Sequence, residues 1–536
     1  MSRDLWKIVG GADKGGILVR EGESVKSAMA SARLSTDAVV AQLGLQGDRL
    51  NYELLRGTGP KSGWVSIRLK DNELAVRMIE TEEELAELFP ASEASAIVEP
   101  DKVSPSDQLP KDNQQEEVPS ATSPSRISAE VRKMFGILGK DAPLEDITVP
   151  DGAALRVVTI SDIHVDYKAN IAWFDKHIPK KTKGIFNVLI LPGDISDDIE
   201  VLRNSLKMFL AGFDVVCFTP GNHDMWTRKK GSPDDCMAKF RQILEVCVKL
   251  GVRIRPVRFR SNDGRVPDVF LIPILSWYSS DWDREPEMPW FPKKRELMEW
   301  ADFRLIKWPQ AMKDEVEKRS GNFSFDLEGG TSHAISEIFA AMSESSLEAC
   351  LAARNACSTD GPAPVVISYS HYVPRQELFP PKRFLLNPHL HKVSGSIPLE
   401  EQIRRIRPDL HIFGHTHLTV DLVIDNTRYV QWALGNPNEQ KAMTLAVSQT
   451  GMLVAFDSRE DPRMPPVQTT FWGRFFERYP RDVHEICPAS FIRTTFKTRY
   501  PEVELPFNDH YFATQTSNPG PPITDYDGLF EPRWRQ

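Results

Sequence analysis

The sequence has few cysteines, no long apolar run and no excess of positive charge. Six cysteines are spread over 536 residues without a CxxC pair, which is typical of reduced thiols in a cytosolic protein. The longest apolar runs, such as FNVLIL, are far shorter than the ~20 residues that cross a bilayer. The first residues, MSRDLWKIVGG, lack the apolar segment of a signal peptide. We therefore expect a soluble, cytoplasmic protein with no membrane partner.

The charge balance argues against a general nucleic-acid partner. Lysine and arginine number 66 against 75 acidic residues, which gives a net charge of −9. Such a chain has no overall attraction to nucleic acid or to an anionic membrane, although a local basic patch is compatible with it. The length exceeds the size at which one hydrophobic core keeps growing, so we expect at least two domains.

The first region, residues 1–88, consists of short β-rich segments separated by turns. Its segments ILVREGES and GPKSGWVSIR resemble those of SH3-like barrel modules. The resemblance implies a small all-β barrel. Modules of this kind usually bind peptides or protein surfaces, so a protein or peptide partner is one interpretation and an accessory barrel without a partner is the other.

The second region, residues 89–149, is predicted to be a linker. Up to about residue 127 it is rich in Ser, Pro, Gln and acidic residues, and such a segment cannot bury enough apolar surface to offset its ordering entropy. A short amphipathic helix, SAEVRKMFGILG, is expected before the next domain begins. The last region, residues 461–536, is rich in Pro and aromatic residues and is expected to wrap or dock as a C-terminal extension.

The third region, residues 150–460, alternates β-rich runs with amphipathic helices, which predicts an α/β domain. The β-rich runs are LRVVTI, NVLIL, DVVCFT, VFLIPIL, VVISY and LHIF. A first helix has apolar residues at steps of three and four: Ile199, Leu202, Leu206, Phe209 and Phe213. A second helix has such a stripe and a glycine at its end: Met237, Phe240, Leu244, Cys247 and Gly251. The segment MTLAVSQTGMLVAF is expected to form a further hairpin.

Metal-capable side chains follow five of these runs, at the carboxyl ends of strands, where open α/β sheets bind ligands. The motifs are SDIH with Asp162 and His164, PGDISDD with Asp194 and Asp197, GNHD with Asn222, His223 and Asp224, SHY with His371, and GHTH with His415 and His417. Each motif alone could be a polar turn or a buried histidine. Five together indicate a metal site.

The residue types point to the metals. No cysteine is among the candidates, which excludes a soft thiolate site, and imidazole with carboxylate suits Mn, Fe, Zn or Ni. Seven candidate ligands are too many for one octahedral ion that keeps a water position. The set therefore favours two ions that share one carboxylate, as in other two-metal hydrolytic sites.

The order DxH, GDxxD, GNHD, H and GHxH resembles the calcineurin-like metallophosphoesterase superfamily over roughly residues 155–440. Uncharacterised plant-type members are similar in ILSWY, DRE, SHYVPRQEL and FGHTH. The resemblance implies a four-layered αββα sandwich with its active site at the strand ends. It implies that Asp162, His164, Asp194 and His417 hold one ion. Asp194, Asn222, His371 and His415 would hold the second, with Asp194 (of GDISD) as the bridge.

The resemblance also implies a mechanism. A water between two divalent or trivalent ions ionises near neutral pH and attacks phosphorus, while Asn222 helps to neutralise charge on the equatorial oxygens. His223 would stabilise or protonate the leaving oxygen, with Asp197 or Asp224 orienting its ring. The sequence thus predicts a phosphatase or phosphodiesterase that acts on a small phosphomonoester or phosphodiester.

Departures from better-known relatives narrow this prediction. The stretch GDISDDIE lacks the arginine of GDxxDRG in Ser/Thr protein phosphatases, and Asp197 stands where purple acid phosphatases have a tyrosine ligand. The alternatives are a protein phosphatase, a nuclease or a non-catalytic scaffold. The complete ligand set argues against a scaffold, and the acidic net charge argues against a nuclease.

Several further residues surround the expected site. The Trp-rich segment 276–345 is expected to roof the pocket. The cations Arg375, Lys382 and Arg383 either bind the rest of a phosphorylated substrate or lie in a solvated loop. His389 and His391 are expected at the surface or at the pocket rim.

Overall fold

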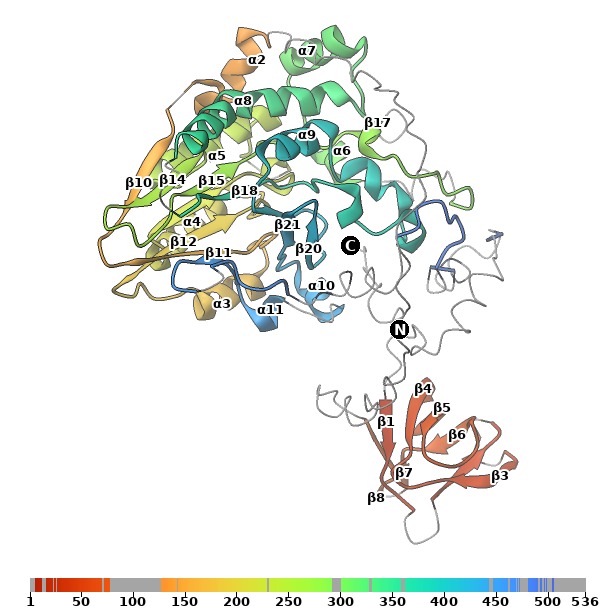
Figure 1. Ribbon diagram of the computed structural model, residues 1–536. Helices are drawn as coiled ribbons and strands as arrows, with labels where there is room; N and C mark the ends of the chain where they lie inside the picture. Colours follow the sequence, from red (N-terminus) through yellow and green to blue (C-terminus); the bar gives the residue numbers. More distant parts are fainter. Residues whose placement is uncertain are drawn as a thin grey trace, which may run out of the picture. The chain divides into compact units, whose positions relative to one another are not determined.

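The computed structural model divides the chain into two compact units, Met1–Ser120 and Ala121–Gln536 (Figure 1). The described residues run from 5 to 77 and from 127 to 505. The gaps are residues 12–15, 23, 26, 70–71, 142, 229–230, 292–299, 327–329, 358–361, 443–446, 461–462, 469, 471, 473–480, 490–491, 494–495, 497 and 499–503. The predicted linker before residue 127 and most of the C-terminal extension therefore lie outside the described residues.

The first unit is all-β, as predicted. Seven strands form one antiparallel sheet in the order β3-β2-β6-β5-β4-β1-β9. They are β1 Leu5–Ile8, β2 Ile17–Arg20, β3 Met29–Leu34, β4 Val39–Gln46, β5 Arg49–Arg56, β6 Ser62–Ser66 and β9 Ala75–Arg77, with a small pair β7 Arg68–Leu69 and β8 Asn72–Glu73. Inward-facing residues such as Ile8, Val40 and Tyr52 are fully buried. The unit fits the predicted SH3-like module.

The second unit contains two sheets. The larger runs in the order β10-β14-β15-β18-β19-β21-β20 and the smaller in the order β13-β12-β11-β22. The larger comprises β10 Glu145–Val149, β14 Val257–Ser261, β15 Val269–Pro273, β18 Val365–Tyr369, β19 Leu410–Phe413, β20 Val420–Ile424 and β21 Thr427–Gln431. The smaller comprises β11 Ala154–Thr159, β12 Ile185–Leu191, β13 Val215–Phe218 and β22 Leu453–Asp457. Parallel and antiparallel pairs occur in both sheets.

The two sheets face each other between layers of helices, which confirms the predicted αββα sandwich (Figure 1). Across the interface, the rings of Phe186 (β12) and Phe259 (β14) lie 6.2 Å apart. Helix α4 packs on β13, and α8 packs on β15. The helices are α3 Lys168–His177, α4 Ile199–Gly212, α5 Cys236–Leu250, α8 His333–Asn355 and α9 Ile397–Ile406. Shorter ones are α6 Ala301–Leu305, α7 Gln310–Ser320, α10 Pro437–Ala442 and α11 Val447–Thr450.

The predicted helices have their expected local causes. The carboxylate of Asp198 caps the N-terminus of α4 by accepting hydrogen bonds from the amides of residues 200 and 201. The predicted stripes of both helices are buried, except Ile199, which is only partly so. Gly251 ends α5 at a φ of 76°, a left-handed conformation that favours glycine.

Residues 127–149 belong to the α/β unit, so the predicted domain start at residue 150 is too late. Helix α2 (Ala129–Met134) forms where a helix was expected, capped by Ser128. Val131 and Phe135 are fully buried, and the ring of Phe135 lies 5.1 Å from that of Phe339 in α8. Strand β10 then pairs with β14 in parallel. Strand β10 lies at the edge of the sheet, and its sequence EDITV contains exposed polar residues between the apolar ones. The sequence was not recognised as a strand because it has no continuous apolar run.

The expected hairpin at residues 443–456 is wrong in its first half. Residues 447–450 form α11, whereas residues 453–457 form β22, which pairs with β11 in antiparallel register. Residues 443–446 lie outside the described residues. Described residues of the C-terminal extension do dock, because Trp472, Ile492 and Phe496 share a small apolar cluster with Trp290 and Phe291. None of the described helices is long and apolar enough to span a membrane.

These boundaries predict different outcomes for two truncations. A chain that begins at residue 121 should fold and melt like the full-length α/β unit. A chain that begins at residue 150 loses β10 and the buried Phe135, and loss of one buried phenylalanine side chain typically costs about 3–5 kcal/mol. It should therefore melt clearly lower or aggregate, as measured by circular dichroism. Equal melting temperatures would show that residues 127–149 are dispensable.

Candidate metal centre

The loops at the strand ends bring all seven predicted ligands together. Each of them exposes 7% or less of its surface. Strand β11 leads to Asp162 and His164, β12 to Asp194, β13 to Asn222, β18 to His371, and β19 to His415 and His417.

Four of these residues form a first group of donor atoms. Asp162, His164, Asp194 and His417 each offer one ligand atom, and these atoms lie within 4.8 Å of one another. The Nε2 atoms of His164 and His417 are 2.9 Å apart, and His417 Nε2 is 3.6 Å from Asp162 Oδ1. This group is compact enough to hold one ion.

A second group surrounds the oxygen of Asn222. Asn222 Oδ1 lies 3.0 Å from His371 Nε2 and 3.0 Å from His415 Nδ1, and these two nitrogens are 3.3 Å apart. Asp194 Oδ1 is 3.5 Å from His371 Nε2. Asp194 therefore belongs to both groups, as the bridging assignment requires.

The outer hydrogen bonds leave the inner atoms without protons. His371 Nδ1 donates to the carbonyl of Pro192 (2.9 Å), and His415 Nε2 donates to the carbonyl of Val393 (2.8 Å). A neutral imidazole carries a proton on only one of its two ring nitrogens. The nitrogens of His371 and His415 that face Asn222 Oδ1 are therefore unprotonated and present lone pairs. Three acceptors within 3.3 Å repel one another unless a cation lies between them. The second group thus fits a metal ion on its own geometry.

The carboxylates point to the same conclusion. Burial raises the pKa of Asp194 well above its usual value, and the nearby carboxylates of Asp224 and Asp162 raise it further. Burial is also the main cause that raises the pKa of Asp162. Two acidic groups buried side by side need positive charge to stay ionised. Metal ions would supply that charge.

The backbone of the site is strained. Asp162, His164, Asp194, His415 and His417 have φ values of 49°, 38°, 56°, 80° and 56°. Side chains other than glycine rarely adopt this left-handed region, and each such residue costs about 1–3 kcal/mol. Strain of this kind persists where the surrounding structure imposes it, and it concentrates at functional sites. Nothing in the sequence pattern reveals it.

Residues 155–418 match the family model of the calcineurin-like phosphoesterases. This part of the chain is a calcineurin-like phosphoesterase domain. The family is metal-dependent, in keeping with the two donor groups. The matched range contains every predicted ligand.

The individual proteins similar to this chain have low sequence identity to it. The [acyl-carrier-protein] phosphodiesterase PptH of Mycobacterium tuberculosis is 24% identical over 170 residues, which cover 30% of this chain and 51% of that protein. The chain thus matches about half the length of this curated relative. The crystal structure of phosphopantetheinyl hydrolase (PptH) from M. tuberculosis is 18% identical with a TM-score of 0.39, and the match covers 59% of this chain and 99% of that one. A putative 5′-nucleotidase from Staphylococcus aureus is 9% identical with a TM-score of 0.24, covering 52% and 48%.

The other motif residues of the phosphoesterase domain have distinct positions. Asp224 accepts hydrogen bonds from the backbone amides of residues 194, 195, 196 and 221 at 2.8–3.0 Å. Both of its oxygens are thereby used to join the GDISD and GNHD loops, so the expectation that Asp224 orients His223 is wrong. Asp197 accepts from the guanidinium of Arg228. A role for Asp197 in catalysis stays a prediction.

His223 lies beside the ligands. Its ring stacks on Trp226 with centroids 3.6 Å apart and meets His164 edge-on at 4.8 Å. Its Nε2 is 3.9 Å from Asp194 Oδ2, and 30% of its side chain is exposed, whereas Asp194 is buried. The residue that flanks this ring, Trp226, was not singled out from the sequence.

Sequence reasoning also missed two carboxylates that hold ligands in place. Glu439 in α10 accepts from His417 Nδ1 at 2.7 Å, which leaves His417 Nε2 for the metal. Asp302 in α6 accepts from Asn222 Nδ2 at 3.0 Å. Glu439 follows β21 in a polar turn, GNPNEQ, so its position at a strand end was a readable signal. Asp302 carries no such signal.

The described part of the Trp-rich insertion does reach the site. The rings of Tyr278 and Trp300 lie 6.2 and 6.0 Å from that of His415. The prediction that three cations of the segment VPRQELFPPKRF lie in a solvated loop is wrong, because all three are buried: Arg375, Lys382 and Arg383. Arg375 pairs with acidic side chains at 2.6 Å, and Lys382 pairs with Asp283 at 2.7 Å.

The two unassigned histidines differ from each other. His391 is fully buried and donates from Nε2 to the carbonyl of Pro380 at 2.8 Å, so its expected surface or rim position is wrong. His389 is half-buried, with its ring 5.1 Å from that of Phe291. Neither lies in the described donor groups.

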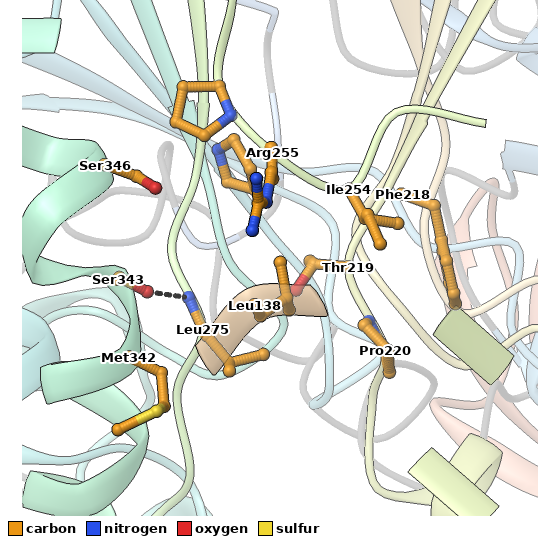
Figure 2. Close-up of a pocket in the computed structure, with 12 residues that line it drawn as sticks. Leu138, Phe218, Thr219, Pro220, Ile254, Arg255, Leu275, Met342, Ser343 and Ser346 are labelled. Carbon is orange, nitrogen blue, oxygen red and sulfur yellow. Dashed lines mark hydrogen bonds between the residues drawn. The ribbon is translucent and has the colours of Figure 1, made fainter. Parts of the chain in front are cut away.

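Figure 2 shows a pocket elsewhere in the α/β unit. Its lining includes Thr219 and Pro220, which precede the GNHD loop, and Leu275, whose amide donates to Ser343 Oγ in α8. The lining is mostly apolar and contains none of the predicted ligands. It is therefore not the metal centre.

The close packing of the motif glycines generates a prediction. A Cβ atom on Gly221 would lie 2.2 Å from Asp194 Oδ1 and 2.6 Å from His371 Cε1, so Gly221→Ala must displace ligands. We expect lower metal content and turnover reduced about 100-fold, the usual effect of moving a site group by ~1 Å. Gly44→Ala is the control, because its Cβ would meet nothing closer than 3.8 Å. Equal metal content and activity in both variants would contradict the prediction.

Proposed function

We propose that the phosphoesterase domain hydrolyses a small phosphorylated substrate with two bound metal ions. The observation that carries this proposal is the pair of buried donor groups that share Asp194. In the second group, the outer ring nitrogens of His371 and His415 carry the protons and donate them to backbone carbonyls. The inner ring nitrogens therefore present lone pairs. Two groups of this kind favour a binuclear site of Mn, Fe or Zn.

The residues suggest how the site works. Asp162, His164 and His417 would hold one ion, and the residues around Asn222 the other, with Asp194 between them. When bound, two ions would supply Lewis acidity and would lower the pKa of a water molecule at the site. The chain itself fixes His371 and His415 through the carbonyls of Pro192 and Val393.

His223 is proposed to act on the leaving oxygen. Its amide donates to Asp194 Oδ1 at 3.0 Å, which fixes it at the bridge, while its partly exposed ring can reach a substrate. Stacking on Trp226 restricts the ring to one orientation. A histidine in this position can donate a proton to an alkoxide as the ester bond breaks.

The substrate class is inferred from one relative and from the net charge of the chain. The relative at 24% identity is named a phosphodiesterase that acts on acyl carrier protein, which favours a phosphodiester over a monoester. The net charge of −9 disfavours nucleic acid. A protein phosphatase and a non-catalytic scaffold are weaker alternatives, the latter because the donor set is complete.

Two further proposals concern the setting of the enzyme. The six cysteines are free thiols, which supports a reducing compartment such as the cytoplasm. The N-terminal all-β unit is proposed to bind a protein or peptide partner.

Two substitutions separate metal binding from proton transfer. Asp194→Asn removes a charge that both ions need, so metal occupancy and turnover should fall together. His223→Ala should keep both ions and lose roughly 10²–10⁴-fold in turnover on an unactivated ester, the usual size of an acid–base contribution. The loss should be smaller for a nitrophenyl ester, whose leaving group hardly needs a proton. Loss of an ion from His223→Ala, measured by elemental analysis, would show that the assignment is wrong.

A substrate panel tests the reaction class. The full chain, stripped with chelator and reloaded with Mn²⁺, Zn²⁺ or Fe²⁺, should hydrolyse phosphodiesters such as bis(nitrophenyl) phosphate faster than the matching monoester. The chelated protein should be inactive. Full activity after complete metal removal would overturn the proposed function, and a preference for the monoester would overturn only the diester assignment.

A further inference from the structure

Asp302 is a buried carboxylate that lies outside the metal-ligand set. It belongs to α6 in the insertion between β15 and β18 and is fully buried. Its Oδ1 accepts hydrogen bonds from Asn222 Nδ2 at 3.0 Å and Trp226 Nε1 at 2.6 Å. Its Oδ2 accepts from the hydroxyl of Tyr278 at 3.0 Å and Trp300 Nε1 at 2.8 Å. Both oxygens are thus fully engaged.

All four donors are neutral. Within the described part of the chain, no lysine or arginine pairs with Asp302. A buried anion held only by neutral donors is costly, and the four hydrogen bonds to Asp302 are the interactions that offset this cost.

One consequence concerns the orientation of Asn222. A side-chain amide can turn over and exchange its oxygen for its NH₂ group. Without a cation, the reversed amide would be favoured on the inner side, because its NH₂ could donate to the lone pairs of His371 Nε2 and His415 Nδ1. That reversal would fill the place of the second ion with N–H bonds. It would also turn the amide oxygen toward the carboxylate of Asp302, and two acceptors would then face each other.

We propose that Asp302 is a positioning residue that holds Asn222 in the one orientation able to bind the second metal ion. The inference rests on the proposed two-ion function, and it makes the insertion part of the metal centre. The same carboxylate anchors Tyr278 and Trp300, whose rings lie beside His415. One buried charge therefore fixes both a ligand and the wall next to another ligand.

The test is a Mn²⁺ titration of the full chain after chelation, with free Mn²⁺ followed by electron paramagnetic resonance. Wild type should bind two ions. In Asp302→Asn, the new amide cannot accept on both sides, so Asn222 is free to turn over. The first ion should bind as in wild type, and affinity for the second should fall about 10–100-fold, the usual effect of losing an outer partner of a metal ligand. Turnover should recover at saturating Mn²⁺, which a general folding defect would not allow.

A second variant covers the case in which Asp302→Asn does not fold. Trp300→Phe keeps the carboxylate and removes one donor from Oδ2, and it should weaken the second Mn²⁺ several-fold. The matched control is Asp421→Asn, because Asp421 is equally buried and pairs with Arg428 at 2.6 Å, away from the donor groups. The control should lower the melting temperature and keep both ions.

The outcomes are distinguishable. Two ions of wild-type affinity in the foldable variants would overturn the role of Asp302 and leave the proposed function intact. Equal loss of the second ion in Asp421→Asn would also overturn that role, since any buried substitution would then have the effect. Wild-type protein that binds fewer than two Mn²⁺ would overturn the two-ion function and this inference together.

Discussion

The shared position of Asp194 is the constraint on which the rest of the site depends. Its carboxylate must face both donor groups, and each group combines residues from loops of both sheets. Asp162, His164 and Asn222 follow strands of the smaller sheet, whereas His371, His415 and His417 follow strands of the larger one. The site therefore exists only if the two sheets pack in one register. The contact between Phe186 and Phe259 is one of the contacts that join the two sheets.

Outer hydrogen-bond partners then decide which atom each candidate ligand can offer to a metal ion. Backbone carbonyls orient His371 and His415, and carboxylates orient His417 and Asn222. These partners come from loops, from α10 and from the insertion, which have little in common in sequence. What they share is that each engages the outward-facing proton of a ligand. The inner surface of the site is consequently rich in lone pairs, and this favours cations over water.

Much of this could be predicted because the signals are local. The six apolar runs correspond to β11, β12, β13, β15, β18 and β19, and all of them except β15 lead directly to candidate donor residues. The edge strand β10 was missed because three of its five residues are exposed, and their polar side chains break up the apolar run. The position of Asp302 could not be read from the sequence either, since it meets Asn222 across 80 residues. Contacts between distant segments depend on packing, which no local pattern encodes.

The left-handed backbone at five of the candidate ligands sets stability against metal binding. Glycine would relax the conformation at Asp162 or His164 and would at the same time delete a donor atom. Selection for stability alone would therefore favour glycine at these positions and would remove the side chains that could bind a metal ion. A variant library sorted only for thermal stability would identify the same residues, as positions where glycine is gained and hydrolysis is lost.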